Sequence, residues 1–335
     1  MSIFIEFLSQ KDVVIADGAT GTNLFSKGLE TGYPPELWNI EHPEHIKFLH
    51  NSFLDAGSDL ILTNSFGGTR YRLKLHQSEN QVTEINMAAA SIARDVADNA
   101  DRQIIVAGSV GPTGELFSPL GSLEHSSAVD AFKEQCDALH AGGVDAIWIE
   151  TMSSIEELDA ALEAAASTGL PVCATMTFDT SGRSMMGIKP EYFSENANQS
   201  ALTCFGANCG IGPAELIHSI SHFSGSAKDK FIIAKGNCGI PVYDEGEISY
   251  KGTPELMADY AVLARDLGAK IIGGCCGTTP THIKAMATAL AEQPKQVFSQ
   301  SRADSLLGLA WEGQNLNADV TDSLTRRTRS KRRRD

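Results

Sequence analysis

The chain has 335 residues, 42% of them hydrophobic, which is enough for a sizeable core, and no stretch approaches the roughly 18 consecutive apolar residues of a transmembrane helix. Seven cysteines and an N-terminus without a signal-peptide pattern argue against a disulfide framework, so we expect a cytoplasmic protein with reduced thiols. The net charge is −15 although the last ten residues, "RRTRSKRRRD", are basic, and an acidic body argues against a nucleic-acid enzyme.

Eight short runs rich in Val, Ile and Ala follow one another along the chain. They are continuous apolar runs, which are typical of parallel strands buried on both faces of a sheet. The predicted strands cover residues 13–18, 60–65, 104–111, 146–151, 172–178, 204–209, 231–237 and 271–277.

Amphipathic helical patterns alternate with these runs. Several begin at Ser or Thr and end at Gly, as helix caps do. The predicted helices cover residues 43–57, 127–143, 154–169, 253–268 and 279–293, with a weaker one inside 190–202. This alternation predicts a (β/α)8 TIM barrel over residues 1–293. A doubly wound open sheet is the alternative, but "DGATGT" lacks the G-x-G-x-x-G spacing that would favour it.

Residues 294–335 form a predicted C-terminal extension with a disordered basic tail. Within it, "SRADSLLGLAWEG" is consistent with a short helix or an arm that packs on a partner subunit. An isolated barrel has no need of this segment, so we expect it to serve assembly into a homo-oligomer.

Cysteines gather at the predicted ends of neighbouring strands. Cys209 ends the sixth strand, Cys238 follows the seventh, and Cys275 and Cys276 end the eighth. The carboxyl ends of the strands carry the active site in such barrels. Clustered thiolates favour zinc, and three protein ligands with one open position are typical of a catalytic zinc site. The alternative is that these cysteines are small buried apolar residues.

The adjacent positions of Cys275 and Cys276 restrict how their thiols can be used. A disulfide between Cys275 and Cys276 would close a strained ring. Neighbouring residues of a strand also face opposite ways, so both thiols can reach one metal only where the strand has ended. Gly273, Gly274 and Gly277 provide the backbone freedom for such a turn.

Other polar and aromatic residues are predicted at the same end of the barrel. Asp17 and Glu150 end the first and fourth strands, where each could hold an ammonium group, act as acid or base, or cap a helix. Gly18 and Asn64 stand at strand ends as well. An aromatic wall for a cationic ligand, or ordinary packing, would be formed by Trp38, Tyr33, Phe66 and Tyr71.

Six motifs in order resemble the homocysteine S-methyltransferase family. They are "DGATGT" (17–22), "TNSF" (63–66), "GPTG" (111–114), "ETM" (150–152), "ANCG" (207–210) and "GGCCGTTPTHI" (273–283). The resemblance implies a (β/α)8 barrel in which Cys209, Cys275 and Cys276 bind Zn²⁺, and it gives Cys238 no part in the metal set. It further implies that homocysteine is the methyl acceptor and that Asp17 and Glu150 bind its amino group.

The methyl donor is less strongly indicated. Members of the family that use methyl-folate need additional domains that this sequence lacks, so we expect a small onium donor. The stretch 236–261 and the basic tail look like bacterial betaine–homocysteine methyltransferases. That resemblance places Trp38 against the quaternary nitrogen of glycine betaine and Phe66, Asn64 and Gly18 in the substrate site. A sulfonium donor, S-methylmethionine or dimethylsulfoniopropionate, is the alternative, and a non-catalytic zinc or thiol sensor is a remote one.

Overall fold

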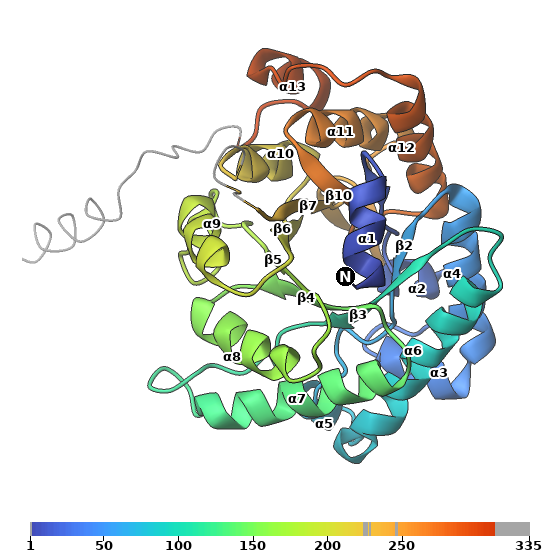
Figure 1. Ribbon diagram of the computed structural model, residues 1–335, viewed down its shortest axis with the longest axis vertical. Coiled ribbons are helices and arrows are strands. Elements are labelled where there is room, and N and C mark those ends of the chain that lie inside the picture. The colour runs from blue at the N-terminus through green and yellow to red at the C-terminus, as the bar shows by residue number, and fades with distance from the viewer. Residues whose placement is uncertain (1, 224–226, 228, 245–246, 312–335) are drawn as a thin grey trace, which may run out of the picture.

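The computed structural model describes residues 2–223, 227, 229–244 and 247–311, and its centre is a closed ring of eight parallel strands (Figure 1). The strands are β1 (Val14–Ile15), β2 (Leu60–Leu62), β3 (Ile105–Val110), β4 (Ala146–Met152), β5 (Val172–Met176), β6 (Cys204–Cys209), β7 (Phe231–Gly236) and β10 (Ala269–Gly274).

The sheet closes between its first and second strands. The order is β1-β10-β7-β6-β5-β4-β3-β2, and Ala16 pairs in parallel with Leu60 at the seam. The backbone N–H of Asp17 donates to the carbonyl of Leu60 across it at 3.0 Å. The predicted TIM barrel is therefore confirmed, and the open-sheet alternative is wrong.

Helices surround the ring of strands (Figure 1). Those at predicted positions are α4 (Pro43–Ala56), α7 (His125–Ala141), α8 (Ile155–Ala166), α9 (Pro190–Gln199), α11 (Pro254–Asp266) and α12 (Pro280–Glu292). The structure adds α2 (Gly21–Phe25), η1 (Pro35–Leu37), α3 (Trp38–Glu41), α5 (Arg70–Lys74), η2 (Glu79–Gln81), α6 (Val82–Asp98) and α10 (Pro213–Ser221).

The amino end of the barrel is plugged by the first helix, α1 (Ile3–Gln10). Its buried Phe4, Phe7 and Leu8 pack against the strand residues that fill the barrel interior, such as Trp148 and Ile271. Burying such side chains stabilises the fold by about 1.5–3 kcal/mol each. With the amino end sealed, the carboxyl end is the open mouth of the barrel.

Two further elements were not predicted in detail. The hairpin of β8 (Pro241–Asp244) and β9 (Glu247–Tyr250) follows β7 at the carboxyl end. Helix α13 (Gln300–Leu307) packs on α10 and α11 of its own barrel, and Arg302 pairs with the buried Asp266. The proposed basic tail lies outside the described residues. None of the helices in the described part of the chain is long and apolar enough to span a bilayer.

Candidate metal and substrate site

Three thiols converge at the carboxyl end of the barrel. Cys209 is the last residue of β6, and Cys275 and Cys276 occupy the turn that follows β10. Their three sulfur atoms lie within 4.8 Å of one another, and Cys209 Sγ is 4.0 Å from Cys276 Sγ. In a tetrahedral site with Zn–S bonds of about 2.3 Å, sulfur atoms are about 3.8 Å apart. The cluster therefore has the spacing of three ligands to one metal ion.

Backbone hydrogen bonds fix the turn that carries the adjacent cysteines. The N–H of Cys275 donates to the carbonyl of Gly236 at 2.7 Å, and the carbonyl of Cys276 accepts from Cys238 N at 2.9 Å. Gly277 then turns the chain with a φ of 77°, and a Cβ there would lie 2.2 Å from the ring of Tyr250. Only glycine fits this position, so the turn brings both thiols to one side.

Cys209 is held in a backbone conformation that is unusual for a non-glycine residue. Its φ is 59°, and Thr151 at the end of β4 has a φ of 63°. Asn208 joins the two, because its side chain accepts from Thr151 N at 3.0 Å and donates to Thr151 Oγ1 at 2.7 Å. Strain of this kind is often maintained at functional sites.

The thiols influence each other's ionisation. Hydrogen bonds from Cys209, Cys275 and the hydroxyl of Tyr250 lower the pKa of Cys276, whereas contacts with Cys275 and Cys276 raise the pKa of Cys209. One thiolate is thus favoured and the others are held protonated by its negative charge. A divalent cation would allow all three to ionise together, and thiolates are ligands that zinc prefers. The donor set therefore fits zinc.

The thiols line a cavity of about 290 Å³. Its wall includes most of the residues that the sequence placed here: Gly18, Asn64, Phe66, Glu150, Cys209, Cys275 and Cys276. It also contains Glu36, Ser109, Lys235 and Phe25, which were not predicted. Lys235 and Ser109 lie within strands whose other residues are mostly apolar. Only the knowledge that their side chains point into the barrel could have identified them as site residues.

Glu150 is one of two carboxylates that line the cavity; the other, Glu36, accepts from Gly67 N at 2.6 Å. Glu150 is 7% exposed, and Ser109 Oγ donates to its Oε1 at 2.5 Å. Burial, followed by the neighbouring Cys275, raises the pKa of Glu150 to about 7. No other side chain among the described residues donates a hydrogen bond to it in the structure, so it can accept from a ligand.

Asp17 is differently placed. Its Oδ1 lies 2.6 Å from the ammonium of Lys235 and its Oδ2 accepts from Leu62 N at 2.8 Å. It is 1% exposed and does not line the cavity, whereas Lys235 does. The structure therefore separates the two carboxylates that the sequence grouped together.

The comparison with known proteins follows from this geometry. A family model described as homocysteine S-methyltransferase matches residues 14–290, which include all eight strands and the three clustered cysteines. The chain belongs to this family. The predicted resemblance is thus confirmed.

Two curated relatives are much longer than this chain. Methionine synthase of Mycobacterium tuberculosis is 31% identical over 323 residues, which cover 90% of this chain and 27% of that protein. Methionine synthase of Mycobacterium leprae is 30% identical over 305 residues, 86% of this chain and 25% of that protein. The chain thus spans about a quarter of the curated relatives that it matches.

Solved structures share the fold of this family member. The metallated form of the homocysteine methyltransferase MmuM from Escherichia coli superposes with a TM-score of 0.70 at 23% identity, covering 84% of this chain and 98% of that one. The apo form of MmuM gives a TM-score of 0.65 at 21% identity, with 84% and 97% covered.

Of the aromatic residues predicted for the site, the structure places one at the cavity and the others elsewhere. Phe66 lines the cavity, but Trp38 does not. Trp38 begins α3 and is 7% exposed, and its ring contacts His42 edge-on and His45 at a tilt, one and two turns later. The short helix turns its ring toward α4 instead of the cavity. Tyr33 pairs with Glu41 at the surface. Tyr71 packs against the core.

A second cluster could hold a metal, yet it differs from the thiols. His42, Glu44 and His45 offer three ligand atoms within 4.8 Å of one another. The side chain of Glu44 is 66% exposed, and both imidazoles already contact Trp38 and the glutamate. Because these groups are solvated and do not line the cavity of the thiols, this cluster does not resemble the thiol site.

Cys238 stays apart from the thiol cluster. Its Sγ lies 3.2 Å from the carbonyl of Gly252 and 3.1 Å from His282 Nε2, and the side chain is buried. Among the described residues, only Cys209, Cys275 and Cys276 form a cysteine cluster with metal-ligand spacing. A closed four-thiolate site would need Cys238 to give up these partners.

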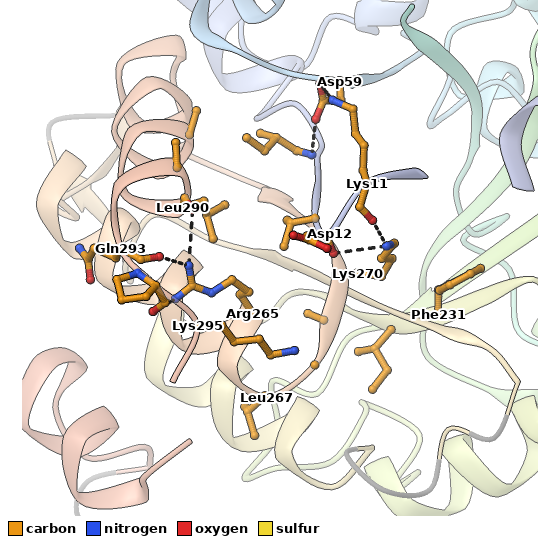
Figure 2. Close-up of a pocket in the computed structure, with 18 of the residues that line it drawn as sticks. Lys11, Asp12, Asp59, Phe231, Arg265, Leu267, Lys270, Leu290, Gln293 and Lys295 are labelled. Atoms are coloured by element: carbon orange, nitrogen blue, oxygen red, sulfur yellow. Dashed lines mark hydrogen bonds and ion pairs between the residues drawn. The ribbon is translucent and has the colours of Figure 1, made fainter. Parts of the chain in front are cut away.

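A larger hollow, about 980 Å³, lies at the opposite end of the barrel (Figure 2). Three of its cations, Lys270, Arg265 and Lys11, already serve the fold. Lys270 donates to the carbonyls of Lys11 and Asp12, and Arg265 donates to those of Leu290, Gln293 and Pro294 at the end of α12. Lys11 pairs with Asp59 at 2.6 Å. These cations thus already have hydrogen-bond acceptors within the chain, and size alone does not make this hollow the functional site.

Proposed function

We propose that this chain transfers a methyl group from glycine betaine to the sulfur of homocysteine, with Zn²⁺ held by Cys209, Cys275 and Cys276. The observation that carries the proposal is the convergence of three thiols in a cavity at the carboxyl end of the barrel that is also lined by Glu150. Membership of the homocysteine S-methyltransferase family supports the acceptor and the reaction class.

The bond changes are simple. The sulfur of homocysteine attacks a methyl carbon of betaine, an S–C bond forms, and the C–N bond breaks with its electron pair going to nitrogen. The products are methionine and dimethylglycine, and the thiol proton of homocysteine leaves to solvent. When bound, zinc supplies the lowered thiol pKa that makes the acceptor nucleophilic at neutral pH.

The chain's own residues then position the reactants. Glu150 binds the ammonium of homocysteine, and Ser109 orients that carboxylate. Phe66 and Phe25 supply aromatic wall to the cavity, which excludes water and suits a quaternary nitrogen. Holding two reactants at attack distance contributes a large part of the rate in a displacement of this kind.

The size of the cavity supports a small donor. Its volume of about 290 Å³ lies at the lower end of the range for ligand sites, about 300–1,000 Å³. Homocysteine and a compact onium compound suit such a space better than a large folate. A sulfonium donor, S-methylmethionine or dimethylsulfoniopropionate, would meet the same aromatic wall and is the second candidate.

A donor panel tests the proposal. Zinc-loaded protein is incubated with homocysteine and, separately, betaine, S-methylmethionine, dimethylsulfoniopropionate or dimethylglycine, and methionine is measured. We expect the highest kcat/KM with betaine and no methionine with dimethylglycine. A higher value with either sulfonium compound would replace betaine as donor. No methionine from any onium compound would contradict the proposal.

A further inference from the structure

Two histidines of α10 form a pair outside the thiol cavity. His218 lies in the last turn of the helix, and His222 follows the helix directly, four residues along the chain. Side chains at this spacing are neighbours on a helix, and the two ring centroids are 5.0 Å apart. Their Nε2 atoms lie 3.4 Å from each other. With metal–nitrogen bonds of about 2.0–2.1 Å, two ligands of a tetrahedral site are about 3.4 Å apart, so the pair has that spacing.

A carboxylate sets the orientation of one of these rings. Glu191, from the first turn of α9, places its Oε1 2.7 Å from Nδ1 of His222. A neutral imidazole that donates its Nδ1 proton keeps its lone pair on Nε2, which here faces His218. Histidines that bind metals commonly donate their other ring N–H to a carboxylate in this way, which fixes the tautomer and makes the ligand more basic.

The pair borders a cavity of about 340 Å³. The side chain of His222 is 35% exposed, so an ion can reach the nitrogens and water can complete its coordination. Arg183 and Lys189 line the same cavity, and Glu191 is the one carboxylate among the described residues that line it. An ion would therefore be held by nitrogen lone pairs and not by an excess of negative charge. That favours Zn²⁺ or Ni²⁺ over Mg²⁺ or Ca²⁺, which prefer oxygen ligands.

We propose that His218 and His222 bind a divalent transition-metal ion such as Zn²⁺ or Ni²⁺, and that Glu191 positions His222 for it. The ion is additional to the one at the thiols, and its binding is independent of the proposed methyl transfer. A proton shared by the two nitrogens would leave to solvent on binding. Because two imidazoles hold an ion less tightly than three thiolates, gel filtration in metal-free buffer should leave zinc at the thiols alone.

Calorimetry on the untagged, full-length protein tests the proposal. The protein is loaded with zinc at the thiols, gel-filtered in metal-free buffer and then titrated with zinc chloride. We expect one further Zn²⁺ per chain, bound with a Kd below about 100 μM. No further uptake, or a weaker Kd, would overturn the proposal.

Substitutions assign the further ion to its ligands. His218→Ala and His222→Ala should each weaken its binding at least about tenfold, because one of two nitrogen ligands is lost. His140→Ala, which removes an exposed histidine of α7, is the matched control and should stay within about twofold. His45→Ala should do the same. An ion that is lost in His45→Ala and kept in His218→Ala belongs to the exposed cluster described above, which would contradict the assignment.

Glu191→Ala tests the positioning of His222. We expect the affinity for the further ion to fall about tenfold, as loss of a carboxylate behind a metal-binding histidine gives. Glu195→Ala removes the same charge from an exposed position of the same helix and should change the affinity by less than about twofold. Equal losses in the two variants would mean that Glu191 acts through its charge alone and does not position the ring.

Anomalous diffraction needs no substitution and therefore also covers variants that do not fold. Crystals of the zinc-loaded wild type are soaked in nickel chloride, and data collected at the nickel edge locate the added ion separately from the zinc. We expect a peak about 2.1 Å from the Nε2 atoms of both His218 and His222. A peak only beside His42 and His45, or no peak, would contradict the proposal.

Discussion

The two ends of this barrel hold similar polar groups, but those at one end are bonded within the chain and those at the other end face a cavity. At the amino end, Arg265, Lys270 and Lys11 donate to carbonyls and carboxylates of the chain itself. At the carboxyl end, Glu150, Lys235 and three thiols share a cavity in which part of their bonding capacity is unused. A polar residue at the first end stabilises the fold, whereas one at the second end is available to a ligand.

Cys276→Ala tests the difference between the two ends most strongly. We expect bound zinc to fall from about one ion per chain to near zero, and methionine formation to fall by roughly a thousandfold or more, because three ligands are needed for a catalytic zinc site. Metal analysis and a steady-state assay measure the two quantities. Cys136→Ala, a buried cysteine of α7, is the matched control and should retain zinc. Full zinc content and full activity in Cys276→Ala would refute the metal assignment.

Glu150→Gln should give the next largest effect. The amide keeps the shape of the side chain but loses its charge, so we expect kcat/KM for homocysteine to fall about 10–100-fold while zinc content is unchanged. The affinity for 4-mercaptobutyrate, which has no ammonium, should stay within about twofold. Equal losses for the two thiols would mean that Glu150 does not bind the ammonium.

The pH dependence of binding provides a smaller signal from the same carboxylate. Because the pKa of Glu150 is raised to about 7, it loses its charge as the pH falls from 8 to 6. The ratio of homocysteine affinity to 4-mercaptobutyrate affinity should therefore decrease toward pH 6, by up to about tenfold. The ratio cancels the ionisation of the thiol that both ligands share. A constant ratio, or one that rises at low pH, would contradict the role of Glu150.

A change at the amino end should alter stability but not catalysis. Arg265→Met leaves carbonyls at the end of α12 without their donor and removes a partner of the buried Asp266. We expect the free energy of unfolding to fall by about 3 kcal/mol, with kcat/KM within about twofold of the wild type. Chemical denaturation and the methyl-transfer assay measure these. A large loss of activity in a folded variant would show that the two ends are not independent.

Much of the fold could be predicted from the sequence because parallel strands buried on both faces leave a continuous apolar signal. The segment around Cys275 and Cys276 shows that a turn after a strand could also be anticipated. The sequence placed both cysteines at the end of the last strand, and the structure ends β10 at Gly274, so the turn geometry that the glycines suggested is observed.

The missed residues have a common physical reason. Lys235 and Ser109 are single polar residues inside apolar strands, and a one-dimensional pattern does not reveal which interior group each will meet across the barrel. Trp38 shows the converse, because its position after the first strand suggested the cavity, but a short helix turns its ring away from it. Pairings such as Asp17 with Lys235 join residues far apart in the chain and depend on closure of the sheet.

X-ray absorption at the zinc edge, with and without homocysteine, tests the central claim most directly. We predict three sulfur ligands at about 2.3 Å and one lighter ligand in the free protein, changing to four sulfur ligands when homocysteine binds. A sulfur count that does not change on addition of homocysteine, or four sulfur ligands already present in the free protein, would contradict the account.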